Sequence, residues 1–198
     1  MEDMKYKILE KVSLFKGFFK FEGFTVQHDT FKGGSLTIER ELLERGDAVA
    51  ILLYDKHYDE VLLIEQFRIA PAVRQDNAWM IEVVAGMLDE GEDKVQCAIR
   101  ESIEEAGYEP FDIQFLGKTY ASPGGTSECL YMYLGYVDKN RPVSEGGGLD
   151  EEHEDIRKLW VSREEAVKMA QDGRINSSVP MLAVMLSFGI DGVIPCKD

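Results

Sequence analysis

Three glutamates in the segment Arg100–Glu105 have a spacing that suits metal binding. On a helix, Glu101, Glu104 and Glu105 lie three and four residues apart, so their side chains share one face. Like charges at this spacing destabilise an isolated helix by about 0.2–0.5 kcal/mol per pair. A divalent cation between them would remove that cost, because Mg²⁺ prefers carboxylate oxygen. From these residues alone, a solvated acidic helix face is the competing interpretation.

The residues around this helix follow a longer pattern. Gly86 is followed after five residues by Glu92, and after seven more by Arg100-Glu101-Ser102-Ile103-Glu104-Glu105-Ala106-Gly107-Tyr108. This resembles the Nudix box, G-x5-E-x7-R-E-U-x-E-E-x-G-U, in which U is a bulky apolar residue. Every charged and glycine position matches. Ser102 at the first U position and the aromatic Tyr108 at the last depart from the pattern, and neither departure affects a catalytic position.

The resemblance implies a metal site on this helix. Glu101 and Glu105 would bind Mg²⁺ directly, with the backbone carbonyl of Ala85 as a further ligand. Glu104 would be either another ligand or a carboxylate held by Arg100. Two or three Mg²⁺ ions are implied, for which Mn²⁺ could substitute. Such metals neutralise a pyrophosphate and stabilise charge that develops during its hydrolysis.

A second segment indicates the substrate. Ser122-Pro123-Gly124-Gly125-Thr126-Ser127-Glu128 begins 15 residues beyond Gly107. The two glycines let backbone approach a ligand closely, and side chains such as Ser122 and Glu128 can hydrogen-bond sugar hydroxyls. The segment resembles one in the ADP-ribose pyrophosphatase branch of the Nudix enzymes. That branch hydrolyses ADP-ribose to AMP and ribose 5-phosphate. An ordinary hairpin turn, and GDP-mannose or another nucleoside diphosphate sugar as substrate, are the alternatives.

The long segment Asn140–Glu154 contains three consecutive glycines followed by a cluster of acidic residues. A loop of this length within a compact domain is often functional. By the same resemblance, Glu152 would be the general base that activates water, and Glu154 would bind a third metal ion. The two could exchange roles. His153, whose side chain titrates near neutral pH, is a third candidate for the base.

Further substrate contacts are expected from cations and aromatic residues. Arg40 and Arg68 are rare cations in an acidic chain, and guanidinium groups suit phosphate and ribose oxygens. Phe18 and Phe19 could stack an adenine, as the ADP-ribose branch does with the N-terminal strands of a partner subunit. Surface ion pairing of the arginines and core packing of the phenylalanines are the alternatives. The remaining candidates for substrate binding are Glu41, next to Arg40, and Met87, next to the box glycine.

The hydrophobic pattern predicts the elements that carry these residues. Strands are expected at 5–13, 18–31, 36–43, 48–54, 61–66, 79–85, 115–121, 130–137 and 156–161, and helices at 93–106, 163–171 and 178–188. The predicted fold is an α/β (α+β) Nudix fold, with a mixed β-sheet sandwiched between helices and a small N-terminal antiparallel sheet.

Two domains are expected, an N-terminal β subdomain at 1–45 and a Nudix hydrolase domain at 46–198. The first three strands are too few to bury a core alone. The family resemblance implies a domain-swapped homodimer, in which residues 1–45 serve dimerisation and substrate specificity.

Charge and composition exclude several classes of protein. The 198-residue chain has a formal net charge of −15, which disfavours nucleic acid and anionic membrane surfaces as partners. No stretch approaches the roughly 18 apolar residues of a membrane span. Cys97, Cys129 and Cys196 are odd in number and scattered, so we expect a cytoplasmic enzyme in a reducing compartment. A sensor Nudix domain, which binds its ligand without cleaving it, commonly lacks a box carboxylate, and all are present here.

Overall fold

The structure is a computed structural model that describes residues 3–189, so Cys196 and the extreme ends of the two expected domains lie outside the described residues. The chain divides into two compact units. The first contains Met1–Asp47 together with Tyr120–Cys129, and the second contains Ala48–Thr119 and Leu130–Asp198. The segment 120–129 is thus separated by more than seventy residues of sequence from the strands with which it packs.

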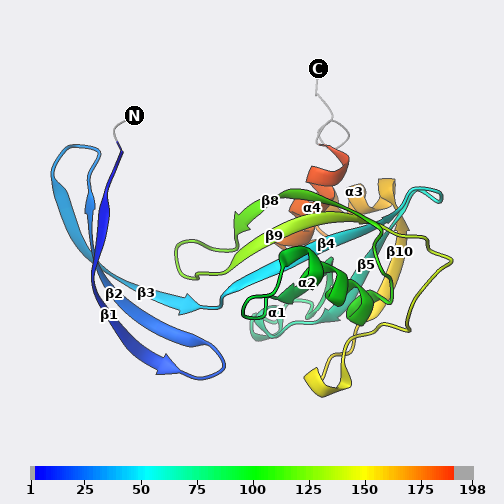
Figure 1. Ribbon diagram of the computed structural model, residues 1–198, viewed down its shortest axis with the longest axis horizontal. Helices are drawn as coiled ribbons and strands as arrows, with labels where there is room; N and C mark the ends of the chain where they lie inside the picture. The colour runs from blue at the N-terminus through cyan, green and yellow to red at the C-terminus, as the bar shows by residue number, and fades with distance from the viewer. Residues whose placement is uncertain (1–2, 190–198) are drawn as a thin grey trace. The chain divides into compact units, whose positions relative to one another are not determined.

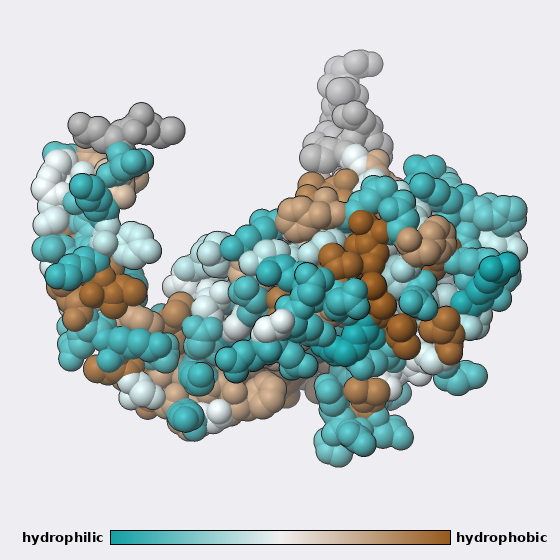
Figure 2. Space-filling model, viewed as in Figure 1, coloured by the Kyte–Doolittle hydropathy of each residue, from teal (hydrophilic) through white to brown (hydrophobic). Residues whose placement is uncertain are grey.

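The first unit is built on a three-stranded antiparallel sheet in the order β1-β2-β3 (Figure 1). Its strands are β1 (Tyr6–Lys16), β2 (Lys20–Asp29) and β3 (Ser35–Glu44), as the pattern predicted. Phe18 and Phe19, however, lie in the turn between β1 and β2, where the Gly17 N–H donates to the Phe19 carbonyl over 3.0 Å. Every residue of β1 is exposed, and Figure 2 shows apolar side chains on the surface of this sheet. The sheet therefore leaves apolar surface in water.

The second unit is built on a sheet in the order β10-β5-β4-β9-β8, with β6 paired to β5 and β7 paired to β4 (Figure 1). Its strands are β4 (Asp47–Asp55), β5 (Glu60–Phe67), β6 (Trp79–Glu82), β7 (Val84–Met87), β8 (Asp112–Tyr120), β9 (Cys129–Tyr136) and β10 (Arg157–Ser162). Helices cover both faces, which confirms the predicted sheet sandwiched between helices.

The core lies on the two central strands. Ala50–Leu53 and Val61–Ile64 are buried without interruption. Alternate residues of a strand point to opposite faces, so both faces must be covered. On one face, Val49, Ile51 and Ile64 cluster with helix residues such as Ala98. The opposite face is covered by α3 (Arg163–Asp172) and α4 (Ser178–Phe188), which contribute Ala166, Met169, Ala183 and Val184 to the buried set.

The single strand predicted at 79–85 is wrong in one respect, because the chain changes partner within it. β6 pairs with β5, placing Glu82 opposite Ile64, whereas β7 pairs with β4, placing Ala85 opposite Ala50. The apolar run continues through Val83 between them, so the pattern contained no sign of the change. The switch brings Ala85 and Gly86 into the central part of the sheet.

The helix predicted at 93–106 consists of two parts. It begins as α2 (Lys94–Glu101), where the Asp93 carboxylate caps the end by accepting from Val95 and Gln96 N–H. It continues as a π-helix, η1 (Ser102–Ala106), and ends at Gly107 with φ +80°. The Ser102 hydroxyl, in place of the apolar residue of the pattern, donates to the Ala98 carbonyl over 2.6 Å. Short π segments are frequent at functional sites.

The remaining helices bear on the predictions in two ways. Ser162 accepts from the Glu165 N–H over 3.1 Å and Gly173 follows the helix with φ +84°, which confirms the predicted ends of α3. The five-residue helix α1 (Ile69–Val73) was not predicted, because it is too short to show a helical period. Within residues 3–189, none of the helices has the length and apolar character needed to span a membrane.

Candidate active site

The box glycine, Gly86, is required because the Glu101 carboxylate lies against its α-carbon. A β-carbon on Gly86 would lie 1.8 Å from Glu101 Oε1 and 2.6 Å from its Cγ. β7 therefore passes directly over the last residue of α2. Any side chain at Gly86 would displace Glu101 from this position, which gives a steric reason for the first residue of the Nudix pattern.

Glu105 is the most buried carboxylate of the helix, with 2% of the residue exposed. One of its oxygens, Oε2, accepts from the Ala85 N–H over 3.1 Å. Burial, together with the nearby carboxylates of Glu101 and Glu154, raises the pKa of Glu105 to about 9. Burial likewise raises the pKa of Glu101 to about 7, again with a contribution from Glu154. The tertiary structure therefore brings Glu154 within electrostatic reach of the helix pair.

Arg100 connects the other charged positions of the box. Its Nε donates to Glu92 Oε1 over 3.0 Å, and its Nη1 donates to Glu101 Oε1 over 2.7 Å and to Glu104 Oε2 over 3.0 Å. The Arg100 guanidinium lowers the pKa of Glu92 to about 2. Glu92 also accepts from the Asp89 N–H over 3.1 Å, which ties the preceding loop to the helix. Arg100 therefore holds the Glu104 carboxylate as well as that of Glu101.

The carboxylate oxygens of Glu101 and Glu105 suit a hard divalent cation, although these two side chains do not form a complete set of ligands. No group of three or more His, Cys, Asp or Glu side chains within residues 3–189 is arranged to hold a metal. Glu105, however, is a buried carboxylate whose pKa is raised chiefly by burial, and a divalent cation beside Glu101 would favour its charged form. Cys97, one turn before Glu101, stays a thiol, because burial raises its pKa to about 12.

The acidic loop places its two candidate glutamates differently. Glu152 ends a short 3-10 helix, η2 (Asp150–Glu152), and its side chain is exposed. His153 follows with φ +56°, in the left-handed region. Glu154 is half-buried, and its Oε2 accepts from the Leu149 N–H over 3.1 Å. In this arrangement the Glu154 carboxylate caps the backbone of its own loop.

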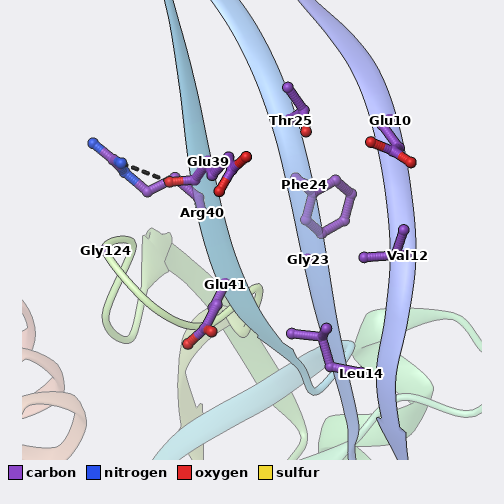
Figure 3. A pocket seen from close by; sticks show the side chains of 10 residues that line it. All are labelled: Glu10, Val12, Leu14, Gly23, Phe24, Thr25, Glu39, Arg40, Glu41 and Gly124. Carbon is purple, nitrogen blue, oxygen red and sulfur yellow. Dashed lines mark hydrogen bonds between the residues drawn. The ribbon is translucent and has the colours of Figure 1, made fainter.

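In the first unit, Arg40, Glu41 and Gly124 line one groove of about 610 Å³ (Figure 3). Gly23 on the central strand lies in the same groove, between Val12 and Glu41 in the strand register. The Arg40 Nη1 donates to the carbonyl of Glu39 over 2.7 Å (Figure 3). Three predicted substrate-binding residues are thus brought together. The complete lining is Glu10, Val12, Leu14, Gly23, Phe24, Thr25, Glu39, Arg40, Glu41 and Gly124.

The segment Ser122–Glu128 is held against the end of β3. The Leu43 N–H donates to the Gly125 carbonyl over 2.9 Å, and the Ser127 N–H donates back to the Leu43 carbonyl over 3.0 Å. The Ser127 hydroxyl donates to Glu44 Oε1 over 2.6 Å, which lowers the pKa of Glu44. Within the segment, the Ser122 carbonyl accepts from the Gly125 N–H over 3.1 Å, so the segment contains a turn, which was the alternative interpretation.

Arg45, which was not predicted as a site residue, contacts two of the predicted substrate-binding residues, Glu128 and Phe19. Its Nε lies 3.1 Å from Glu128 Oε1, and its guanidinium carbon lies 4.6 Å from the centre of the Phe19 ring. Phe18 packs edge-on against Phe19 and is 88% exposed, so core packing does not account for it. The sequence signal that could have identified Arg45 was Glu44-Arg45-Gly46, a charged pair before the glycine that precedes the second unit.

Arg68 and Met87 lie in the second unit. Arg68 forms a two-point ion pair with Glu82, from Nε over 3.0 Å and from Nη2 over 2.8 Å, and Gln66 donates to the same carboxylate oxygen. Arg68 thus forms an ion pair with Glu82, a partner that the sequence did not reveal. Met87 is exposed, and its carbonyl accepts from Arg100 Nη2 over 3.4 Å.

Comparison with known proteins is consistent with this geometry. The chain is 40% identical over 179 residues to the ADP-ribose pyrophosphatase of Escherichia coli, a match that covers 90% of this chain and 85% of the relative. It is 36% identical over 182 residues to that of Haemophilus influenzae, covering 90% and 83%. The GDP-mannose pyrophosphatase of Shigella flexneri is 36% identical over 145 residues, covering 73% and 74%.

A solved structure described as an ADP compounds hydrolase superposes with a TM-score of 0.69 at 21% identity, covering 92% of each chain, and shows the fold. The model of the Nudix domain family matches residues 44–181, which include the whole Gly86–Tyr108 pattern. The chain therefore belongs to the Nudix family.

Proposed function

We propose that this protein hydrolyses the pyrophosphate of ADP-ribose to AMP and ribose 5-phosphate, with Mg²⁺ as the metal. The observation that carries the proposal is the buried carboxylate of Glu105 beside Glu101, under a strand in which any side chain at position 86 would displace Glu101. The relatives from Escherichia coli and Haemophilus influenzae, which match over 90% of this chain, are ADP-ribose pyrophosphatases. Enzymes of that kind use a divalent metal, in agreement with the donor set.

The side chains of the second unit divide the chemistry between them. Glu101, Glu105 and the Ala85 carbonyl would hold the metal, with Glu154 as a further ligand. When bound, the metal neutralises the pyrophosphate and lowers the pKa of a bound water. Arg100 orients Glu101 and Glu104 through the bonds described above. Glu152, exposed on its loop, accepts a proton from the attacking water, whose oxygen bonds to phosphorus as the bridging P–O bond breaks.

Substrate recognition belongs to residues in both units. Phe18 and Phe19 would stack the adenine, while Arg40, Glu41, Gly124, Ser122, Glu128, Arg68 and Met87 would contact the sugar and phosphate groups. The exposed apolar residues of β1 support a domain-swapped homodimer, in which residues 1–45 of one copy serve the site of the other, because surface of this kind is usually covered by a partner. Residues 46–198 would form the hydrolase domain. Two buried free thiols, Cys97 and Cys129, support a cytoplasmic enzyme.

GDP-mannose is the second candidate substrate. Relatives described as GDP-mannose pyrophosphatases match at 36% and 33% identity, the latter, from Klebsiella pneumoniae, over 85% of this chain. Because relatives of both kinds match this chain, the choice of substrate would depend on how the first unit binds the base and the sugar.

A substrate panel with Mg²⁺ tests the proposal. The purified protein is incubated with ADP-ribose, GDP-mannose, diadenosine polyphosphates and NADH, and products are identified by chromatography. We expect the highest kcat/KM for ADP-ribose, with AMP and ribose 5-phosphate in equal amounts. A higher kcat/KM for GDP-mannose would make the second candidate correct. Absence of turnover on all four would overturn the hydrolase assignment.

A further inference from the structure

The chain segment that follows β9 crosses the C-terminal end of the catalytic helix, which consists of α2 and η1, and hydrogen-bonds to its carbonyl groups. The Gly147 N–H donates to the Glu105 carbonyl over 2.8 Å, and the Gly148 N–H donates to the Glu104 carbonyl over 3.1 Å. The Ser144 hydroxyl donates to the Ile103 carbonyl over 3.0 Å. Carbonyls at the end of a helix lack partners within the helix, so this segment supplies them.

At this crossing the two backbones are too close for side chains. A β-carbon on Gly107, at φ +80°, would lie 2.4 Å from the Ser144 carbonyl oxygen. A β-carbon on Gly146, at φ +62°, would lie 2.6 Å from the Ala106 carbonyl carbon and from the Gly107 nitrogen. Backbone atoms cannot rotate away as a side chain can. Gly107 is therefore required for the close approach of residues 144–146 as well as for ending the helix.

The crossing leads directly into the loop that carries Glu152 and Glu154. The Ile156 N–H donates to the Gly147 carbonyl over 3.1 Å, which closes the base of the loop. A β-carbon on Gly148 would lie 2.4 Å from the Glu154 β-carbon, so that contact also depends on glycine. Gly147 thus bonds the helix through its N–H and the far side of the loop through its carbonyl.

We propose that Ser144, Gly146 and Gly147 are positioning residues for hydrolysis. The crossing sets the point at which the acidic loop leaves the catalytic helix, and so sets Glu152 and Glu154 relative to Glu101 and Glu105. The side chains of Glu101 and Glu105 would hold the metal, while the backbone carbonyls of the same helix hold the base of the acidic loop. The metal-binding glutamates and the loop are therefore positioned by the same helix. The inference rests on the proposed function for the roles of these four glutamates.

The test compares Gly146→Ala with Gly173→Ala. Both glycines have positive φ, Gly146 at the crossing and Gly173 just after α3, but nothing lies within 4 Å of a β-carbon on Gly173, so only the first variant displaces the crossing. Misplacing catalytic groups by about 1 Å costs on the order of 10²-fold in rate. We expect Gly146→Ala to lower kcat for ADP-ribose by that factor with KM within about twofold of the wild type, and Gly173→Ala to change neither. Equal kcat values for the two variants would overturn the inference.

A double-mutant cycle separates positioning from a general loss of structure. Glu152→Gln is introduced into the wild type and into Gly146→Ala. If the crossing acts through Glu152, the double variant should be nearly as active as Glu152→Gln alone, because coupled residues are not additive. If the two losses multiply, both in this cycle and in the same cycle with Glu154→Gln, the crossing acts through neither glutamate and the proposal is wrong. Should Gly146→Ala fail to fold, Ser144→Ala enters the same cycle, since it removes two hydrogen bonds of the crossing: the one that the hydroxyl donates to the Ile103 carbonyl and the one that it accepts from the Gly146 N–H over 3.3 Å.

Amide hydrogen exchange provides a readout that needs neither substrate nor metal. In EDTA, exchange of residues 149–155 should be faster in Gly146→Ala than in Gly173→Ala, while exchange of β4 and β5 stays equal in both. Equal exchange of 149–155 in the two variants would overturn the proposal. A wild-type protein without activity on ADP-ribose would instead overturn the proposed function, and the exchange comparison would still test the crossing.

Discussion

Glu105 and Arg100 in the second unit and Arg40 in the first unit differ in burial and in the number of hydrogen bonds they form. In the second unit, Glu105 is buried against the Ala85 backbone and Arg100 bonds three carboxylates at once. In the first unit, Arg40 bonds only the adjacent carbonyl of Glu39 among the contacts identified in the described chain, and Phe18 is almost fully exposed. Glu105 and Glu101, proposed to bind the metal, are therefore buried or paired, whereas Arg40 and Phe18, proposed for recognition, lie on the exposed surface of the first unit. This difference predicts that changes to the glutamates of the second unit lower kcat and that a change to Arg40 in the first unit raises KM.

Glu105→Gln should have the largest effect. Loss of one metal-binding charge in a buried site is expected to lower kcat on the order of 10³-fold, because electrostatic stabilisation at the reacting phosphate is lost. Steady-state kinetics with saturating Mg²⁺ measure it, and circular dichroism checks the fold. Glu109→Gln, an exposed carboxylate in the same region, is the control and should have wild-type activity. Full activity of Glu105→Gln would contradict the metal assignment.

Glu152→Gln should follow, with kcat lowered about 10²-fold and KM nearly unchanged, because general bases contribute roughly 10²–10⁴-fold. Glu154→Gln is measured beside it. If Glu154→Gln has the greater effect on kcat, and Glu152→Gln the greater effect on the Mg²⁺ concentration for half-maximal rate, the two residues exchange the roles assigned above.

Without the metal, the burial of Glu105 should make the free energy of unfolding depend on pH. Its carboxyl titrates near 4.5 when unfolded and, because of burial, has a folded pKa of about 9. Between these values the folded protein binds more protons, so the free energy of unfolding falls as pH rises. In EDTA we expect the wild type to lose about 2 kcal/mol more than Glu105→Gln between pH 6 and pH 8. Urea unfolding measures this, and parallel pH profiles would contradict the buried charge.

Arg40→Ala should have the smallest effect and should act on KM alone. Loss of a guanidinium contact to substrate is expected to raise KM for ADP-ribose about tenfold, corresponding to roughly 1.4 kcal/mol of binding, with kcat within twofold. Arg141→Ala is the matched control, since that exposed arginine pairs only locally with Asp138 in the second unit. A fall in kcat for Arg40→Ala without a change in KM would break the proposed division between the units.

Local patterns allowed most of the second unit to be predicted. Strands such as β4 and β5 are buried on both faces, so they appear as continuous apolar runs, and α3 carries both of its end signals, Ser162 and Gly173. The π-helix at Ser102–Ala106 and the change of partner at Val83 were not predicted. Neither alters the order of apolar residues, and both depend on which neighbour is in contact.

By itself, the sequence determined the family and the identity of the helix carboxylates. The spacing from Gly86 to Tyr108 is local, and local spacing on a helix sets which side chains share a face. Only the tertiary structure determined why Gly86 and Gly107 must be glycine. It also determined that Glu82 is the carboxylate paired with Arg68, and how residues 144–148 support the acidic loop. These features are contacts between segments far apart in the chain. They depend on the packing of whole elements, which no local pattern encodes.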